Sequence, residues 1–167
     1  MNIRRQFRTT SLVATFIGLS AAAAQANAAE NPVHWSTAPV QKRCSAGSTF
    51  TAKVLALVDP GWHLYALEQE EGGPIPTEIS LAGRSYLSLG TIRASKPIQL
   101  LDPNFNKRVN LYIDKAEFSL PLTVSADATP GPQRAALHVR YQSCNEMMCL
   151  PPRSVTVDLV VFIKAKK

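Results

Sequence analysis

The sequence predicts an all-β fold. From residue 48 onward apolar and polar residues alternate with a period of two, and no amphipathic run of helical period reaches a convincing length. Clusters of glycine, proline, aspartate and asparagine, which favour turns, separate the alternating stretches. Regularly spaced strands with such turns are typical of a two-sheet sandwich, so we expect an immunoglobulin-like arrangement.

The two most regular stretches lie at the two ends of the patterned region. In TFTAKVLALV, residues 49–58, every second side chain is apolar, and SVTVDLVVFIK, residues 154–164, repeats the pattern. Because successive side chains of a strand point to opposite faces, each stretch presents one continuous apolar face. The core side chains expected from these strands are Phe50, Ala52, Val54, Ala56, Val58, Val155, Val157, Leu159, Val161 and Ile163.

Three further strand segments are expected between these ends. They are RSYLSLGTI (84–92), NLYIDKAEFSLPLTV (110–124) and QRAALHVRYQS (133–143), and turn clusters such as EEGGPIP, LDPN and DATPGP separate them. Residues 30–47 are less regular and lead into the first long strand. No internal repeat, linker or second domain is apparent.

The first 28 residues have the features of a signal peptide. A basic start, MNIRRQFR, precedes the apolar run SLVATFIGLSAAAA and small residues that suit cleavage after Ala26 or Ala28. The apolar run has about 14 residues, fewer than the ~20 that a bilayer-spanning helix needs. We therefore expect residues 1–28 to be a signal peptide and residues 29–167 to form one exported domain, with no membrane span after processing.

The net charge argues against nucleic acid as a partner. The whole chain carries +6, and loss of three of its 18 basic residues with the predicted signal peptide leaves 15 basic and 12 acidic residues, a charge of +3. An excess this small is weak for recognition of a polyanion. We expect no nucleic-acid partner and no cofactor.

Three cysteines in an exported protein allow at most one intramolecular disulfide. By proximity the pair is Cys144 with Cys149, within YQSCNEMMCLPP (141–152), and Cys44 remains as a buried packing residue. An extended strand would separate the pair by about 16 Å, whereas a disulfide needs Cα atoms roughly 5.5 Å apart. The chain must therefore fold back between them, and Asn145 suits such a turn. The double proline that follows ends ladder pairing.

Residue chemistry alone leaves the role of this pair open. In the chain-entropy model, a disulfide that closes a six-residue ring stabilises a fold by only about 2 kcal/mol. A disulfide from Cys44 to Cys149 would stabilise it by close to 5 kcal/mol. Exchange instead needs one reachable sulfur, a second sulfur to re-form the bond, and surroundings that favour thiolate. Met147 and Met148 would complement the cysteines as soft ligands for Cu(I), although we predict no metal site. A structural disulfide and a redox pair are equally compatible with the residues, and metal binding is a third alternative.

Three segments together resemble the N-terminal periplasmic domain of the thiol:disulfide interchange protein DsbD. YQSCNEMMCLPP is similar to the family's cysteine motif, in which Tyr-Gln precedes a Cys-to-Cys loop that ends in Cys, an aromatic or aliphatic residue, and Pro-Pro. PGWHLYALEQ (60–69) resembles the family's Gly-aromatic-x-Leu-Tyr segment, and DPNFNKRVNLYIDKAEFSLPLTV (102–124) resembles its cap loop and following strand. The resemblance implies an immunoglobulin-like domain located in the periplasm.

The same resemblance implies an activity and partners. The family relays reducing equivalents by disulfide exchange, from a membrane-embedded thiol transporter through a thioredoxin-like domain to exported oxidoreductases. For this chain it implies a thiol:disulfide oxidoreductase, with thioredoxin-like proteins and a separate membrane thiol transporter as partners. The alternatives are a non-enzymatic β-sandwich that binds a partner while its disulfide only holds a loop, and a periplasmic copper-handling protein.

The resemblance also implies roles for individual residues. Cys149 would form mixed disulfides with partners, and Cys144 would resolve them by closing the internal bond. Phe105 would cover the pair and shield it from stray thiols. The remaining residues of the expected cap loop and pocket are Asp102, His63, Tyr65 and Tyr141.

Two features depart from the family's pattern. Four residues separate the cysteines here, whereas the best-known members have five. Those members also carry acidic residues directly before the cap phenylalanine, where this chain has Pro103 and Asn104, and Asp102 lies one step further away. The second departure raises the question of whether any carboxylate reaches the cysteines.

Overall fold

The computed structural model of the chain describes residues 31–40, 43–83 and 85–165. The regular elements in these residues are strands throughout, which confirms the all-β prediction. In the same part of the chain, no helix has the length and apolar character needed to cross a membrane. The predicted signal peptide, residues 1–28, lies outside the described residues.

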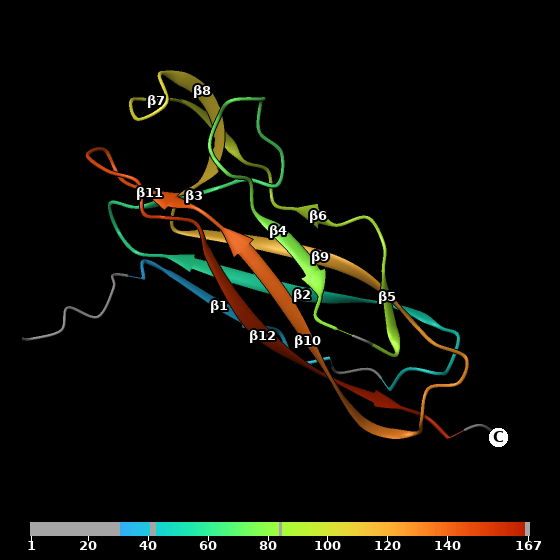
Figure 1. Cartoon of the computed structure of the whole chain (residues 1–167). Helices are drawn as coiled ribbons and strands as arrows, with labels where there is room; N and C mark the ends of the chain where they lie inside the picture. The colour runs from blue at the N-terminus through green and yellow to red at the C-terminus, as the bar shows by residue number, and fades with distance from the viewer. Residues whose placement is uncertain (1–30, 41–42, 84, 166–167) are drawn as a thin grey trace, which may run out of the picture. The chain divides into compact units, whose positions relative to one another are not determined.

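One layer of the fold is an antiparallel sheet of five strands (Figure 1). Its strands are β1 (Val33–Thr37), β2 (Thr49–Val58), β5 (Leu87–Leu89), β6 (Arg93–Ala94) and β9 (Lys115–Val124). The order is β1-β2-β9-β5, and β6 also pairs with β9. The long central ladder runs from Thr49 opposite Thr123 to Leu57 opposite Lys115.

The second layer is a sheet of three strands. They are β4 (Glu78–Leu81), β10 (Gly131–Tyr141) and β12 (Arg153–Ile163), in the order β12-β10-β4. The antiparallel ladder between β10 and β12 extends from Gly131 opposite Ile163 to Tyr141 opposite Arg153. The segment that contains Cys144 follows directly after the end of β10 in this ladder.

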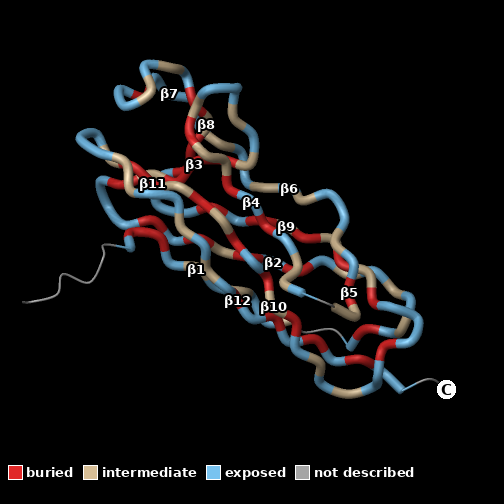
Figure 2. Tube along the Cα trace, in the orientation of Figure 1, coloured by how far each residue is buried: buried red, intermediate tan, exposed pale blue. Residues whose placement is uncertain are grey.

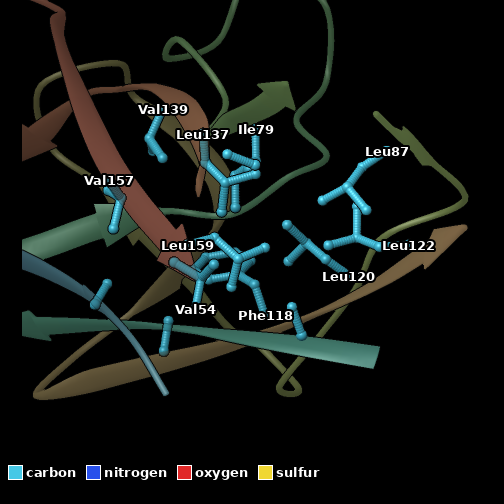
Figure 3. Packing of buried hydrophobic residues seen from close by; sticks show 14 of the residues in the cluster. Val54, Ile79, Leu87, Phe118, Leu120, Leu122, Leu137, Val139, Val157 and Leu159 are labelled. Atoms are coloured by element: carbon cyan, nitrogen blue, oxygen red, sulfur yellow. The ribbon is translucent and has the colours of Figure 1, made fainter. Parts of the chain in front are cut away.

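The core lies between the two layers and follows from the period-two pattern. Val54 and Phe118 from the first sheet are fully buried with Leu137 and Val139 from the second (Figure 3). Buried and exposed residues alternate along the long strands (Figure 2), as expected when one face of each sheet meets the other sheet. Each such side chain stabilises the fold by about 1.5–3 kcal/mol relative to exposure in water. The two facing sheets confirm the predicted sandwich.

A small third sheet lies at one end of these layers (Figure 1). Its strands are β3 (His63–Tyr65), β7 (Ile98–Asp102), β8 (Lys107–Tyr112) and β11 (Ser143–Cys144), in the order β11-β3-β8-β7. We call it the end sheet. Because β11 follows β10 after Gln142 alone, the ladder of the sandwich positions Cys144 at the edge of the end sheet.

The sequence pattern missed one break and the short strands β1, β3, β4, β6 and β7. The segment 110–124, expected as one strand segment, contains the end of β8 and all of β9, separated by a tight turn at Asp114 with φ 63°. Aspartate tolerates this left-handed conformation better than most residues, and the apolar residues on both sides conceal the turn. β1 lies within the irregular residues 30–47, where its sequence VHWST is too short for alternation to stand out.

Removal of a buried leucine should destabilise the sandwich strongly. Leu120 on β9 is fully buried, whereas Leu57 on β2 of the same sheet is 47% exposed. We expect Leu120→Ala to lower the free energy of unfolding by about 2–5 kcal/mol, because it removes apolar contacts and leaves a cavity. Leu57→Ala should change it by about 0.5 kcal/mol. Urea denaturation measures both values, and similar losses in the two variants would contradict this placement of the core.

Candidate functional site

Cys144 and Cys149 form a disulfide, as their proximity in the sequence predicted. The intervening chain folds back through Asn145, whose Oδ1 accepts hydrogen bonds from the backbone N–H groups of Met147 (2.9 Å) and Met148 (2.8 Å). The backbone N–H of Asn145 also donates to the carbonyl oxygen of Met148 at 2.9 Å. Asn145 therefore holds the disulfide-closed loop, residues 144–149, in a tight turn. We call these residues the cysteine ring.

The two sulfur-bearing residues differ in exposure. Cys144 is fully buried, whereas Cys149 is partly exposed. Cys144 belongs to a small apolar cluster with Tyr65, Val109 and Leu111, and Cys149 and Phe105 pack against that cluster. The cluster lies within the end sheet and is separate from the main core. Of the two bonded residues, Cys149 is therefore the more accessible to solvent.

A buried carboxylate lies beside the cysteine pair. Asp102 closes β7 with its side chain fully buried, and its Oδ2 accepts a 2.6 Å hydrogen bond from the hydroxyl of Tyr65 on β3. The same hydroxyl lies 3.8 Å from the Sγ of Cys149. Nε2 of His63 lies 3.3 Å from Asp102 Oδ2 without the alignment of a hydrogen bond. Although Asp102 is one step further from the cap phenylalanine than the family pattern has it, a carboxylate does reach the site.

The surroundings shift the pKa of each of these groups. Burial alone would raise the pKa of Asp102, but hydrogen bonds from Tyr65 and Asn104, together with the attraction of His63 when that residue is protonated, outweigh it, so the pKa is lowered. Burial lowers the pKa of His63 despite the attraction of Asp102. Burial and the hydrogen bond to Asp102 raise the pKa of Tyr65. Near neutral pH the group therefore consists of an ionised Asp102, a neutral His63 and a protonated Tyr65.

Residues 103–106 form the turn between β7 and β8 and cover this cluster. We call this turn the cap loop. The ring of Phe105 meets that of Tyr65 edge-on, with centroids 5.9 Å apart. The backbone N–H of Asn104 donates to Asp102 Oδ1 at 2.8 Å, and Asn106 adopts a left-handed φ of 50° that asparagine tolerates. Phe105 therefore packs against the cluster that contains Tyr65 and Cys144.

Not every residue of the expected site lies beside the cysteines. Tyr141 is fully buried in the main core, where its ring lies 5.3 Å from that of Trp35 and its hydroxyl donates to Asn31 Oδ1 at 2.8 Å. It still belongs to β10 and faces the space between the two large sheets. Cys44 is also buried in that core, as we expected.

Sequence reasoning missed the contact between the cap loop and the cysteine ring. The side-chain Nδ2 of Asn104 donates to the backbone carbonyl of Asn145 at 3.0 Å and so links the cap loop to the cysteine ring. A groove of about 500 Å³ lies nearby, lined by His63, Leu100, Leu101 and Asp102 and by Asn145 of the ring, among others. Asn104 follows an Asp-Pro pair that signals a turn, but the sequence does not indicate what the turn contacts.

The described residues contain no group of three histidine, cysteine, aspartate or glutamate side chains placed to hold a metal ion. What they bring together is a disulfide with one partly exposed cysteine, a tyrosine hydroxyl near the sulfur of that cysteine, and a carboxylate that accepts a hydrogen bond from the hydroxyl. Such an arrangement can take part in nucleophilic exchange at sulfur.

Comparison with known proteins agrees with this chemistry. The family model for the N-terminal part of the thiol:disulfide interchange protein DsbD matches residues 30–161. The chain belongs to this DsbD N-terminal family. No curated protein matches the sequence in a separate comparison.

Two solved structures resemble this member of the family. The DsbD N-terminal domain of Neisseria meningitidis, in the reduced form, is 22% identical with a TM-score of 0.50, and the match covers 70% of this chain and 82% of that one. The N-terminal periplasmic domain of ScsB from Proteus mirabilis is 19% identical with a TM-score of 0.46, over 76% of this chain and 44% of that one. At 22% identity the first match supports the fold.

The lowered pKa of His63 predicts a specific loss of stability in acid. The unfolded chain takes up a proton on this residue near its ordinary pKa of about 6.5, whereas the folded protein does so only at lower pH. The unfolded state therefore binds more protons as the pH falls below about 6.5, and unfolding becomes easier. We expect the free energy of unfolding to fall more between pH 7.5 and pH 5 in the wild type than in His63→Gln.

Urea denaturation at the two pH values gives both differences, and their comparison cancels the other titrating groups that the two proteins share. His34→Gln is a matched control, because that imidazole is exposed beside Asp59 on the surface. Equal acid losses in the wild type and His63→Gln would show that burial does not hold His63 neutral.

Proposed function

We propose that this protein carries out thiol–disulfide exchange through Cys144 and Cys149. The observation that carries the proposal is the difference in exposure within one disulfide, since Cys149 is reachable and Cys144 is fully buried. An exchange protein needs one sulfur that meets the partner and a protected one that re-forms the internal bond. Membership of the DsbD N-terminal family supports the same chemistry.

The proposed reaction begins with the disulfide form. A thiolate of a reduced partner attacks Sγ of Cys149, the bond to Cys144 breaks, and its electron pair leaves on the Cys144 thiolate, which takes a proton. The second thiol of the partner then loses its proton and attacks the partner's own sulfur in the mixed disulfide, which releases Cys149 as a thiolate. The partner is oxidised to a disulfide and this protein is reduced to a dithiol. The reverse sequence passes the two electrons to another partner.

Tyr65 and Asp102 support this chemistry through their positions. The Tyr65 hydroxyl, 3.8 Å from Cys149 Sγ, is close enough for a small movement to bring it into contact with a thiolate there. Its raised pKa keeps it protonated, so it can act as a donor. The ionised Asp102 competes for that same proton and fixes the direction of the hydroxyl in the disulfide form. Tyr65 and Asp102 would therefore adjust how readily the Cys149 thiolate leaves a mixed disulfide and how readily it attacks a disulfide of a partner.

We further propose that Phe105 shields Cys149 from thiols other than those of the partner. The phenylalanine packs against the cluster that contains both cysteines and is held edge-on to Tyr65. Its loop lies at the tip of a two-stranded hairpin, β7 and β8, at the outer side of the end sheet. Such a loop can move without disturbing the sandwich, because the hairpin is not part of either large sheet.

The proposed setting is the periplasm. We propose that residues 1–28 are a signal peptide and that residues 29–167 form the mature exported domain. The partners would be thioredoxin-like proteins and a membrane thiol transporter. The related N-terminal domain of ScsB, described as periplasmic, is consistent with this location.

Single cysteine variants test the exchange. A thioredoxin variant that keeps only its nucleophilic cysteine, activated as a thionitrobenzoate mixed disulfide, serves as the probe. We expect reduced Cys144→Ser to release coloured thionitrobenzoate and form a stable protein–protein disulfide through Cys149, because that sulfur is reachable. Cys149→Ser should react far more slowly, because Cys144 is fully buried. Failure of both variants to react unless denatured would leave a purely structural disulfide as the better explanation.

Replacement of Phe105 should expose the disulfide to small thiols. An edge-on aromatic contact contributes about 0.5–1.5 kcal/mol, which corresponds to a roughly two- to tenfold shift in opening of the loop. We therefore expect Phe105→Ala to be reduced by dithiothreitol about two to ten times faster than the wild type. Phe162→Ala is the matched control, because Phe162 is 45% exposed on β12 in the sandwich. Equal reduction rates in the wild type, Phe105→Ala and Phe162→Ala would contradict the proposed shielding role of Phe105.

A further inference from the structure

Both methionines of the predicted mature domain lie side by side in the cysteine ring. The chain has three methionines, which are Met1 in the predicted signal peptide, Met147 and Met148. Methionine is flexible and apolar, and it commonly fills gaps in a core. Here 87% of Met147 and 49% of Met148 are exposed, so both residues lie at the surface. The exchange reaction proposed above uses neither thioether.

The turn of the ring holds the backbone of both methionines. Asn145 Oδ1 accepts hydrogen bonds from the N–H groups of Met147 and Met148, and the N–H of Asn145 donates to the carbonyl of Met148. The disulfide closes the chain around this turn. Since so little of Met147 is covered, a small oxidant in solvent can reach its thioether.

The ring lies where exposed apolar side chains gather. Among the described residues, six of the nine exposed large apolar side chains belong to β7, to the turn between β8 and β9, or to the ring; they are Ile98, Leu100, Leu101, Ile113, Met147 and Met148. The groove beside the site is lined by three of them and by Asn145 of the ring. Exposed apolar surface concentrated in one place is typical of a contact with another protein.

A protein that exchanges at Cys149 must cover part of this surface. The two sulfurs of a mixed disulfide are about 2.05 Å apart, so the backbone of the partner comes close to the ring. Met148 directly precedes Cys149, and Met147 is two residues away. The thioethers are therefore among the groups that a protein partner covers, whereas dithiothreitol is small enough to attack the disulfide without covering them.

We propose that Met147 is an oxidation site whose sulfoxide slows exchange with protein partners. The inference rests on the proposed exchange at Cys149 and adds a modification site to its docking surface. Hydrogen peroxide is the oxidant. The thioether sulfur attacks one peroxide oxygen, the O–O bond breaks, that oxygen stays on sulfur as the sulfoxide, and the other leaves as water. The sulfur gives up two electrons to the peroxide, and the apolar side chain becomes polar.

Peroxide treatment of the disulfide form tests the site itself. Catalase stops the reaction, and after reduction and alkylation trypsin releases residues 141–153, YQSCNEMMCLPPR, in which tandem mass spectrometry assigns the added oxygen to one methionine. We expect Met147 to be oxidised about twofold faster than Met148, in proportion to their exposure. Equal rates, or faster oxidation of Met148, would overturn the assignment.

Two probes separate docking from attack at the sulfur. Reduced thioredoxin is the protein probe and dithiothreitol the small one; each supplies two electrons and ends as a disulfide, and alkylation with mass counting follows both reactions. For Met147→Gln and for the peroxide-treated wild type, we expect reduction by thioredoxin to be about three- to tenfold slower, as for loss of one apolar interface contact. Reduction by dithiothreitol should change by less than about twofold.

Two further variants are controls. Met147→Leu keeps an apolar side chain that cannot form a sulfoxide, so it should match the wild type with thioredoxin and keep that rate after the same peroxide treatment. Leu57→Gln makes an apolar-to-polar change at a 47% exposed residue of β2 in the sandwich, and it should match the wild type with both probes.

The failures of the two proposals are distinguishable. An unchanged rate of Met147→Gln with thioredoxin, or an equal fall with thioredoxin and dithiothreitol, would overturn the role of Met147 in docking and leave the exchange function intact. A wild-type disulfide that dithiothreitol reduces but thioredoxin does not would overturn the docking surface. A disulfide that neither probe reduces before global unfolding would overturn the exchange function and this inference with it.

Discussion

The site depends on the hydrogen bond between Tyr65 and Asp102. A carboxylate with no exposed side-chain surface would be strongly destabilising without partners, because burial removes it from water. The Tyr65 hydroxyl and the backbone N–H of Asn104 supply those partners, and they come from β3 and from the cap loop. These hydrogen bonds to the Asp102 carboxylate therefore fix the direction of the Tyr65 side chain and the start of the cap loop. The same hydroxyl lies 3.8 Å from Sγ of Cys149, so the constraint extends to that sulfur.

The sandwich makes this arrangement possible by keeping the end sheet in place. β10 pairs with β12 along its whole length and then continues, after one residue, into β11 with Cys144. β3 lies between β11 and β8, so Cys144, Tyr65 and the hairpin of β8 and β7 follow one another across one small sheet. The rigid ladders lie in the two layers, while the cap loop and the cysteine ring project from their end, where movement does not break the core (Figure 1).

The sequence predicted those features that depend on local pattern and local chemistry. Alternation identified β2 and β12 with nearly their observed bounds, and proximity identified the disulfide. Contacts between distant residues could not be read in this way, because Tyr65 and Asp102 are 37 residues apart and nothing in either segment indicates the other. Tyr141 shows that a residue close to the cysteines in the sequence need not lie beside them in the fold. It lies only three residues before Cys144, yet the alternation of β10 directs it into the main core beside Trp35.

The small size of the cysteine ring means that the fold depends little on its disulfide. A ring of six residues restricts the unfolded chain so little that its closure contributes only about 2 kcal/mol. Neither cysteine belongs to the main core cluster, which is built from the facing sides of the two large sheets. Opening the bond therefore removes little of what holds the sandwich together. A disulfide that linked the two layers would stabilise the fold more, but for that reason it would be poorly suited to repeated opening at a partner's approach.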